Sequence, residues 1–310
     1  MGGFDRDNGS ERDRPTEAEA LGDNTVRSGE LRTAIETRTR GEAHADLRQV
    51  VTSGWDQNYR YQSPHGELAM FRTERAGLPE VNSEGVGRYV ERHGAGRPWL
   101  QVAERASPEG LRIIVAADQG GGHGHIRHEG WATEEATMRR VAYLEDPAQL
   151  DPGKRRRGID GLRPGGRHHG CADMSSRIVD PDAFATALAR GAGHPDVRAA
   201  LSTPYDRRQL PRAVWVPIAD LLGSDGHKAC TGWQLEPVAG SVMTAMENRR
   251  AWRAAIADGR LPEVPEPRAR PVRTFEGGTI AFIINSNRQR DGYEIASLFP
   301  RPPVYEFPTR

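Results

Sequence analysis

The sequence predicts a fold that combines helices with short β-strands, and two stretches indicate it most clearly. Residues 279–285 and 293–299 are rich in β-branched and aromatic side chains and flank a polar turn, which is the pattern of a β-hairpin. Residues 180–189 are largely apolar and begin with Asp-Pro, a good N-cap followed by a good first helical residue.

The last predicted strand contains the first candidate site residue. Because side chains alternate between the two faces of a strand, Tyr293, Ile295, Ser297 and Phe299 are expected to share one face. A hydroxyl among three large side chains is a candidate for binding, although a serine satisfied by water at a strand end fits the pattern equally well. Pro300 is expected to end the strand.

Earlier elements are predicted from the same kinds of signal. We expect disorder over residues 1–28, which lack apolar periodicity, and helical or irregular structure over 29–110. The β-branched run 111–117 predicts a strand. Thr133 is followed by two glutamates and predicts the beginning of a helix, because a threonine N-cap and acidic residues both stabilise a helix N-terminus.

The second half of the chain contains three further stretches with a structural signal. Residues 213–218 form a short apolar run that predicts a strand, and 242–256 predict a helix. Residues 261–271 contain four prolines and are expected to connect other elements. Glycine and arginine dominate 151–170, which predicts a loop.

Composition excludes few functions. The 310 residues include 43 basic and 43 acidic side chains, so the net charge indicates no general attraction to nucleic acid. Two cysteines, Cys171 and Cys230, form no metal-binding pair, and either one disulfide or two thiols is compatible with them. The N-terminus lacks the apolar core of a signal peptide, and no apolar run is long enough to span a membrane, so we expect a soluble protein.

A basic run is the one local departure from this balance. Seven lysines and arginines lie between residues 154 and 177, where there are only two aspartates. Such a run is typical either of a phosphate-binding patch or of a solvated loop. The residues of this run that we consider for RNA binding are Lys154, Arg155, Arg156, Arg157 and Arg167.

Histidines are concentrated in two groups, at His123, His125 and His128 and at 168–169. One chemistry that such a group supports is zinc binding, and Cys171 would be a suitable further ligand. However, the spacing of the histidines does not match the helical pair of zinc hydrolases. Loop histidines in a glycine-rich turn are the structural alternative.

The other chemistry is acid–base cleavage of a phosphodiester. RNA carries its own nucleophile, the 2′-hydroxyl, so an enzyme needs a base, an acid and a donor that stabilises the charged phosphorane. Histidine can do either proton transfer near neutral pH, and arginine can hold two phosphate oxygens at once. Such cleavage requires no metal and no cofactor.

Three blocks of sequence resemble a known family. The run Gly-Gly-His-Gly-His-Ile-Arg-His-Glu-Gly at 121–130, the run Ser-Ser-Arg-Ile-Val-Asp at 175–180 and the end of the chain at 292–300 are similar, in this order, to the motifs of RNase A-like toxin modules. These modules form the C-termini of bacterial contact-dependent inhibition proteins and related polymorphic toxins. Here Ser297 takes the place of a threonine and Phe299 that of a tyrosine, so any role of the tyrosine hydroxyl is lost.

The resemblance implies an α+β fold in which N-terminal helices pack on a twisted antiparallel sheet, and a metal-independent endoribonuclease. It implies a catalytic domain over 111–303, with an insertion within 190–275 because this part is longer than expected. The catalytic residues would be His123, His128, Arg139 and Ser297. The residues that we expect to contribute are His125, Arg140, Ser176, Tyr293 and Phe299.

The resemblance also implies partners. These are an RNA substrate, of which tRNA is one candidate, and a cognate immunity protein that covers the cleft. A toxin of this kind would be exported by a specialised system and act in the cytoplasm of a target cell. Two alternatives stay open: a zinc-dependent hydrolase that uses the histidines, and a binding protein related to the toxins but without catalysis.

Overall fold

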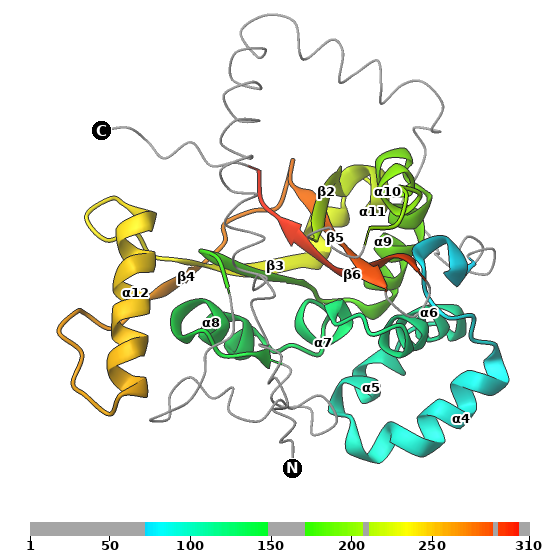
Figure 1. Cartoon of the computed structure of the whole chain (residues 1–310), viewed down its shortest axis with the longest axis horizontal. Helices are drawn as coiled ribbons and strands as arrows, with labels where there is room; N and C mark the ends of the chain where they lie inside the picture. The colour runs from blue at the N-terminus through cyan, green and yellow to red at the C-terminus, as the bar shows by residue number, and fades with distance from the viewer. Residues whose placement is uncertain (1–71, 148–170, 207–210, 288–290, 304–310) are drawn as a thin grey trace, which may run out of the picture.

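The computed structural model describes residues 72–147, 171–206, 211–287 and 291–303, and within them the chain has an α+β fold (Figure 1). The predicted disorder over 1–28 and the basic run at 154–167 lie outside the described residues. Within these residues, no helix combines the length and the hydrophobicity needed to cross a membrane. Both cysteines are buried and neither forms a disulfide.

The helices form two groups along the chain. The first group comprises the 3₁₀ helix η1 (Thr73–Ala76), α4 (Ser83–His93), η2 (Gly94–Gly96), α5 (Pro98–Ala103), α6 (Pro108–Gln119), α7 (Gly124–Arg127) and α8 (Glu134–Tyr143). The second group comprises α9 (Pro181–Gly193), α10 (Pro195–Leu201), α11 (Ile218–Leu222), the 3₁₀ helix η4 (Gly226–Ala229) and α12 (Val242–Ala257). In Figure 1, α4 to α6 lie at the lower right and α12 lies at the left edge.

The strands form two antiparallel sheets, each with three strands in the described residues. Sheet A has the order β1 (Met174–Ile178), β3 (Cys230–Leu235), β4 (Ala269–Pro271). Sheet B has the order β2 (Arg212–Pro217), β5 (Thr279–Asn287), β6 (Gly292–Arg301). The structure therefore has two small sheets where the resemblance implied one.

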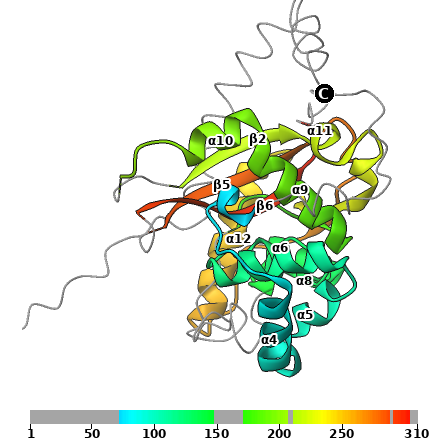
Figure 2. The same ribbon diagram turned by 90° about the vertical axis from the view of Figure 1, so that its right-hand side faces the viewer.

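Sheet B separates the main core from a smaller apolar cluster. On one face, Ile280, Phe282 and Leu298 belong to the main core, and α9, α10 and α11 supply much of its other side. Figure 2 shows α10 and α11 beside β2 and α9 next to β5 and β6. On the other face, Ala281 and Phe299 pack with Ala172, which precedes β1, so this face meets sheet A.

The prediction of a strand over 111–117 is wrong, because these residues lie within helix α6. Ser107 is the N-cap of α6, its hydroxyl accepts a hydrogen bond from the backbone N–H of Gly110, and Pro108 occupies the first turn. Ile113, Ile114 and Val115 are all fully buried. A helical segment in which successive residues are all buried, as 113–118 are, shows no polar face, so its apolar run is indistinguishable from that of a buried strand.

Several predicted elements are confirmed. Thr133 caps α8 and Asp180 caps α9, each by accepting a hydrogen bond from a backbone N–H three residues later. The strand over 213–218 and the helix over 242–256 correspond to β2 and α12. Helix α9 continues past Gly191, where a side chain would collide with the ring of Phe282, so this glycine allows close packing and does not end the helix.

The C-terminal hairpin is also confirmed, but the predicted shared face of its last strand is wrong. β6 contains a β-bulge, because Ile283 of β5 pairs with Ser297 while the next residue, Ile284, pairs with Ile295. The extra residue, Ala296, reverses the alternation of side chains. Tyr293 and Ile295 therefore face the main core, whereas Ser297 and Phe299 face sheet A.

Pro300 does not end β6 as predicted but pairs with Ile280 inside it. β6 is the outer strand of sheet B in the described residues. A proline is tolerated there because its missing N–H interrupts no second ladder. Its carbonyl oxygen accepts a hydrogen bond from the hydroxyl of Ser176, which links the two sheets.

Arg249 provides a test of how the outer helix α12 is attached. Its guanidinium is buried and donates hydrogen bonds to the carbonyl oxygens of Val141, Cys171 and Ala172, at 2.6, 2.8 and 2.8 Å. Arg249→Ala is expected to lower the free energy of unfolding by about 3 kcal/mol or more, because three carbonyls lose charged donors. Urea denaturation measures this difference.

The control is Arg250→Ala, at the next position, whose side chain is exposed. Its free energy of unfolding should stay within about 0.5 kcal/mol of the wild type. Equal stability of the two variants would contradict the role assigned to Arg249.

Candidate active site

His128 lies at the junction of the two sheets and is almost completely buried. Its Nδ1 lies 2.8 Å from the carbonyl oxygen of Ser176 in β1, and its Nε2 lies 3.0 Å from Nη1 of Arg140 in α8. Its ring centroid lies 4.9 Å from that of Phe299 in β6. Residues from three separate stretches of sequence therefore hold one imidazole.

These contacts favour one tautomer of the imidazole. A carbonyl oxygen only accepts hydrogen bonds and a guanidinium only donates them. The arrangement therefore fits a neutral His128 that carries its proton on Nδ1 and presents the lone pair of Nε2. A neutral imidazole with an oriented lone pair is the form that a general base requires.

His123 lies at the other end of the same helical turn. It is the N-cap of α7 and His128 is the C-cap, so the two residues are separated by roughly 7.5 Å along the helix axis. The backbone N–H of His123 donates a hydrogen bond of 2.9 Å to the carbonyl oxygen of Ala296, the bulged residue of β6. The bulge thus anchors the histidine loop beside Ser297.

Glycines allow this close approach. A side chain at Gly124 would lie 3.1 Å from the backbone nitrogen of Leu298 and 3.4 Å from Cα of Ser297, so α7 packs directly on β6. Gly121 has a φ of +90°, which disfavours other residues. The glycine-rich sequence around His123 therefore serves to seat the loop on the strand.

Ser297 presents a buried hydroxyl. The residue is 2% exposed, and among the described residues Oγ has no hydrogen-bond partner. The hydroxyl of Ser175 is buried in the same way. Burying an unsatisfied hydroxyl costs free energy, so such groups are candidates for ligand contacts.

Arg140, and not Arg139, contacts the candidate base. The guanidinium of Arg139 makes two hydrogen bonds to Glu145, at 2.6 and 2.9 Å, and is partly exposed. Arg140 is 2% exposed and lies against His128. The resemblance makes both arginines candidates for the phosphate contact, but successive residues of a helix point in different directions.

Two other predicted contributors are placed elsewhere. His125 is fully buried, and its Nε2 lies 3.0 Å from Oδ1 of Asp118, with its ring against Trp99. Tyr293 faces the main core, where its hydroxyl accepts a hydrogen bond from the backbone N–H of Asp206. Ser176 does reach the site, where its carbonyl orients His128. Residues 154–157 and 167 lie outside the described residues.

Glu129 is a residue of this region that sequence reasoning missed. It follows His128 directly, is fully buried and pairs with Ile178 in a parallel bridge. Burial raises the pKa of its carboxyl from the usual value to about 8, and the neighbouring Asp180 adds to this, against the effects of Arg177 and nearby backbone amides. Its position within the histidine motif was the signal that could have identified it.

In the described parts of the chain, no three His, Cys, Asp or Glu side chains are arranged to hold a metal ion. His169, a ligand of the zinc alternative, lies outside them. No known protein family, curated protein or solved structure matches this chain.

Glu129 predicts a pH dependence of stability. Between about pH 4.5 and about pH 8 the folded protein holds a proton that the unfolded chain has released, so the free energy of unfolding should fall as pH rises. The slope contributed by one group is at most about 1.4 kcal/mol per pH unit. Urea denaturation of the wild type and of Glu129→Gln at pH 5 to 8 measures it.

Glu129→Gln should remove this slope and be the more stable protein near pH 8, because an amide stays neutral. Glu135→Gln, which changes an exposed glutamate of α8, is the control and should leave the slope unchanged. An identical slope in the wild type and in Glu129→Gln would contradict the assignment.

Proposed function

We propose that this chain is a metal-independent endoribonuclease, with His128 as general base and His123 as general acid. The observation that carries the proposal is the contact set of His128. The Ser176 carbonyl and the Arg140 guanidinium contact its two ring nitrogens as a neutral imidazole requires, next to a strand that carries the hydroxyl of Ser297, which has no partner among the described residues.

In this mechanism, Nε2 of His128 accepts the proton of the 2′-hydroxyl as its oxygen attacks the neighbouring phosphorus. Arg140 contacts Nε2 before the substrate binds. A guanidinium makes stronger hydrogen bonds to a phosphate than to a neutral imidazole, so the bound phosphodiester draws it away and releases the lone pair. The same arginine then stabilises the charge of the phosphorane.

The other two groups complete the reaction. His123, at the opposite end of the turn, supplies a proton to the departing 5′-oxygen. Ser297 donates its hydroxyl to a phosphate oxygen, which satisfies a group that is otherwise buried without a partner. The products are a 2′,3′-cyclic phosphate and a 5′-hydroxyl. The protons balance, because His128 takes one from the 2′-hydroxyl and His123 gives one to the 5′-oxygen.

Partners follow from this proposal. The substrate is RNA, with tRNA as one candidate, and the basic residues at 154–157 and 167 would attract its phosphates. A toxin of this kind would require a cognate immunity protein and an export route to the cytoplasm of a target cell. The resemblance to RNase A-like toxins supports these statements.

The decisive test is cleavage of total RNA by the purified chain in excess EDTA. The wild type should cleave and leave 2′,3′-cyclic phosphate ends, and His128→Ala should lose activity by about 10²-fold or more, because a general base is removed. His227→Ala, in the 3₁₀ helix η4, is the control, because this histidine takes no part in the proposed mechanism, and it should keep full activity.

Two outcomes would favour other functions. Activity that is absent in EDTA and restored by zinc would identify the metal-dependent hydrolase. Absence of cleavage under both conditions would favour a binding protein.

Ser297→Ala separates catalysis from stability. The substitution removes a buried hydroxyl that has no partner in the described structure, so the melting temperature should be unchanged or higher. The value of kcat/KM should nevertheless fall by about 10²-fold, because a donor to the phosphorane is lost. A variant with unchanged kcat/KM, or with a lower melting temperature that accounts for its loss of activity, would refute this role.

A further inference from the structure

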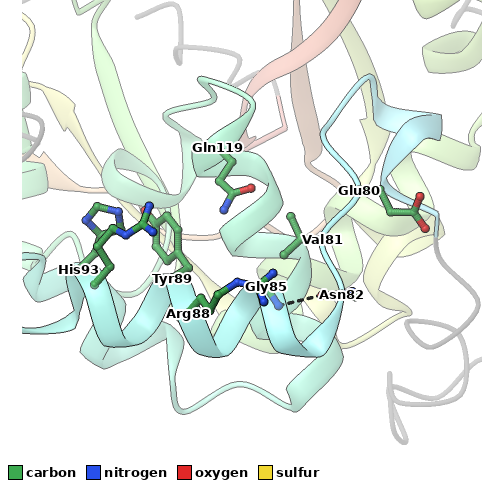
Figure 3. A pocket seen from close by; sticks show the side chains of 9 residues that line it. Glu80, Val81, Asn82, Gly85, Arg88, Tyr89, His93 and Gln119 are labelled. Atoms are coloured by element: carbon green, nitrogen blue, oxygen red, sulfur yellow. Dashed lines mark hydrogen bonds between the residues drawn. The ribbon is translucent and has the colours of Figure 1, made fainter.

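A hollow of about 610 Å³ lies between α4 and the C-terminal end of α6, and His128 is not among the residues that line it (Figure 3). Arg88, Tyr89, Arg92 and His93 line it from α4, and Gln119, the last residue of α6, faces them. Four of these five side chains can donate hydrogen bonds through nitrogen, so the wall is rich in donors.

The hollow is also more basic than the chain as a whole. Arg88 and Arg92 are exposed and one helical turn apart, so their side chains lie on one face of α4. Glu80 is the one carboxylate that lines the hollow. Glu84 pairs with Arg88, but both side chains are largely exposed, and such a pair contributes little and is readily exchanged for a phosphate.

A buried network connects the floor of this hollow with the histidine loop. The hydroxyl of Tyr89 donates a hydrogen bond to Oδ2 of Asp118, and Arg97 pairs with the same oxygen at 2.5 Å. Oδ1 of Asp118 lies 3.0 Å from Nε2 of His125, in the middle of the turn that carries His123 and His128. The position of α4 is thus fixed relative to the catalytic turn.

An RNA strand bound at the proposed active site can also reach this hollow. Three glycines, 120–122, separate Gln119 from His123, so at most about 14 Å of chain joins the wall of the hollow to the proposed general acid. An extended RNA strand covers this distance with a few nucleotides.

We propose that the hollow between α4 and α6 binds a phosphate of the RNA strand that flanks the cleaved bond, through Arg88 and Arg92. This subsite rests on the proposed ribonuclease function for its substrate. It accounts for the presence of two exposed arginines beside Tyr89 and His93, whose rings lie 4.7 Å apart. It also explains why a buried network ties α4 to the catalytic turn.

The test is binding of a fluorescently labelled single-stranded oligodeoxynucleotide, which lacks the 2′-hydroxyl and cannot be cleaved by this mechanism. Fluorescence anisotropy gives Kd for the wild type and for the double variant Arg88→Gln/Arg92→Gln at several salt concentrations. The control is Arg250→Gln/Arg260→Gln, which removes the same charge from exposed positions on and after α12. Figure 1 places α12 at the opposite end of the molecule from α4.

The double variant of α4 should bind at least tenfold more weakly than the wild type. The slope of log K against log salt should fall in magnitude by about one to two, because each arginine that contacts a phosphate contributes roughly one counterion. The α12 control should change Kd by less than threefold. Equal weakening in both double variants, or no weakening in either, would overturn the subsite, as would a wild type that binds no oligonucleotide.

The experiments distinguish failure of the subsite from failure of the proposed ribonuclease function. A chain that binds the oligonucleotide through α4 but does not cleave RNA would retain the subsite and refute the ribonuclease. A chain that cleaves RNA but binds equally well without Arg88 and Arg92 would retain the ribonuclease and refute the subsite. Melting temperatures of all variants should match the wild type, because the four arginines are exposed.

Discussion

The hydrogen bond between the backbone N–H of His123 and the carbonyl oxygen of Ala296 joins the histidine loop to the C-terminal hairpin. Ala296 is the extra residue of a β-bulge, so its carbonyl is released from the regular ladder of sheet B. The same bulge turns Ser297 and Phe299 toward sheet A, where Phe299 meets the ring of His128. The β-bulge of β6 therefore determines three features of the site: the position of the histidine loop, the direction of the Ser297 side chain and the packing of the His128 ring.

Several buried polar groups lie near this junction. Arg249 holds three carbonyl oxygens, Asp118 is shared by Arg97 and His125, and Arg140 lies against His128. Such groups stabilise a fold only when each has its partner, and they fix one arrangement because few others satisfy them. The hydroxyls of Ser297 and Ser175 are among the exceptions to this rule in the described residues, and that of Ser297 is the one that the proposed mechanism uses.

The two proposed regions share this framework. α7 carries the histidines of the proposed mechanism at its ends and His125 in its middle, and His125 is bound to the network that reaches Tyr89 in α4. RNA held at α4 would thus contact an element whose position is fixed relative to His128. A rigid connection of this kind favours catalysis because it holds the reacting groups in place before the substrate arrives.

The sequence by itself determined the local elements with strong signals: the caps at Thr133 and Asp180, the C-terminal hairpin and the histidine motif. Only the tertiary structure decided that 108–119 is a helix, because the burial of all six residues 113–118 removes the polar face that distinguishes a helix from a strand. Only it decided that Arg140 and not Arg139 contacts His128, and that Ser297 faces away from Tyr293. These outcomes depend on the packing of α8 and on a bulge whose partner, His123, is distant in sequence, and local patterns contain no information about such contacts.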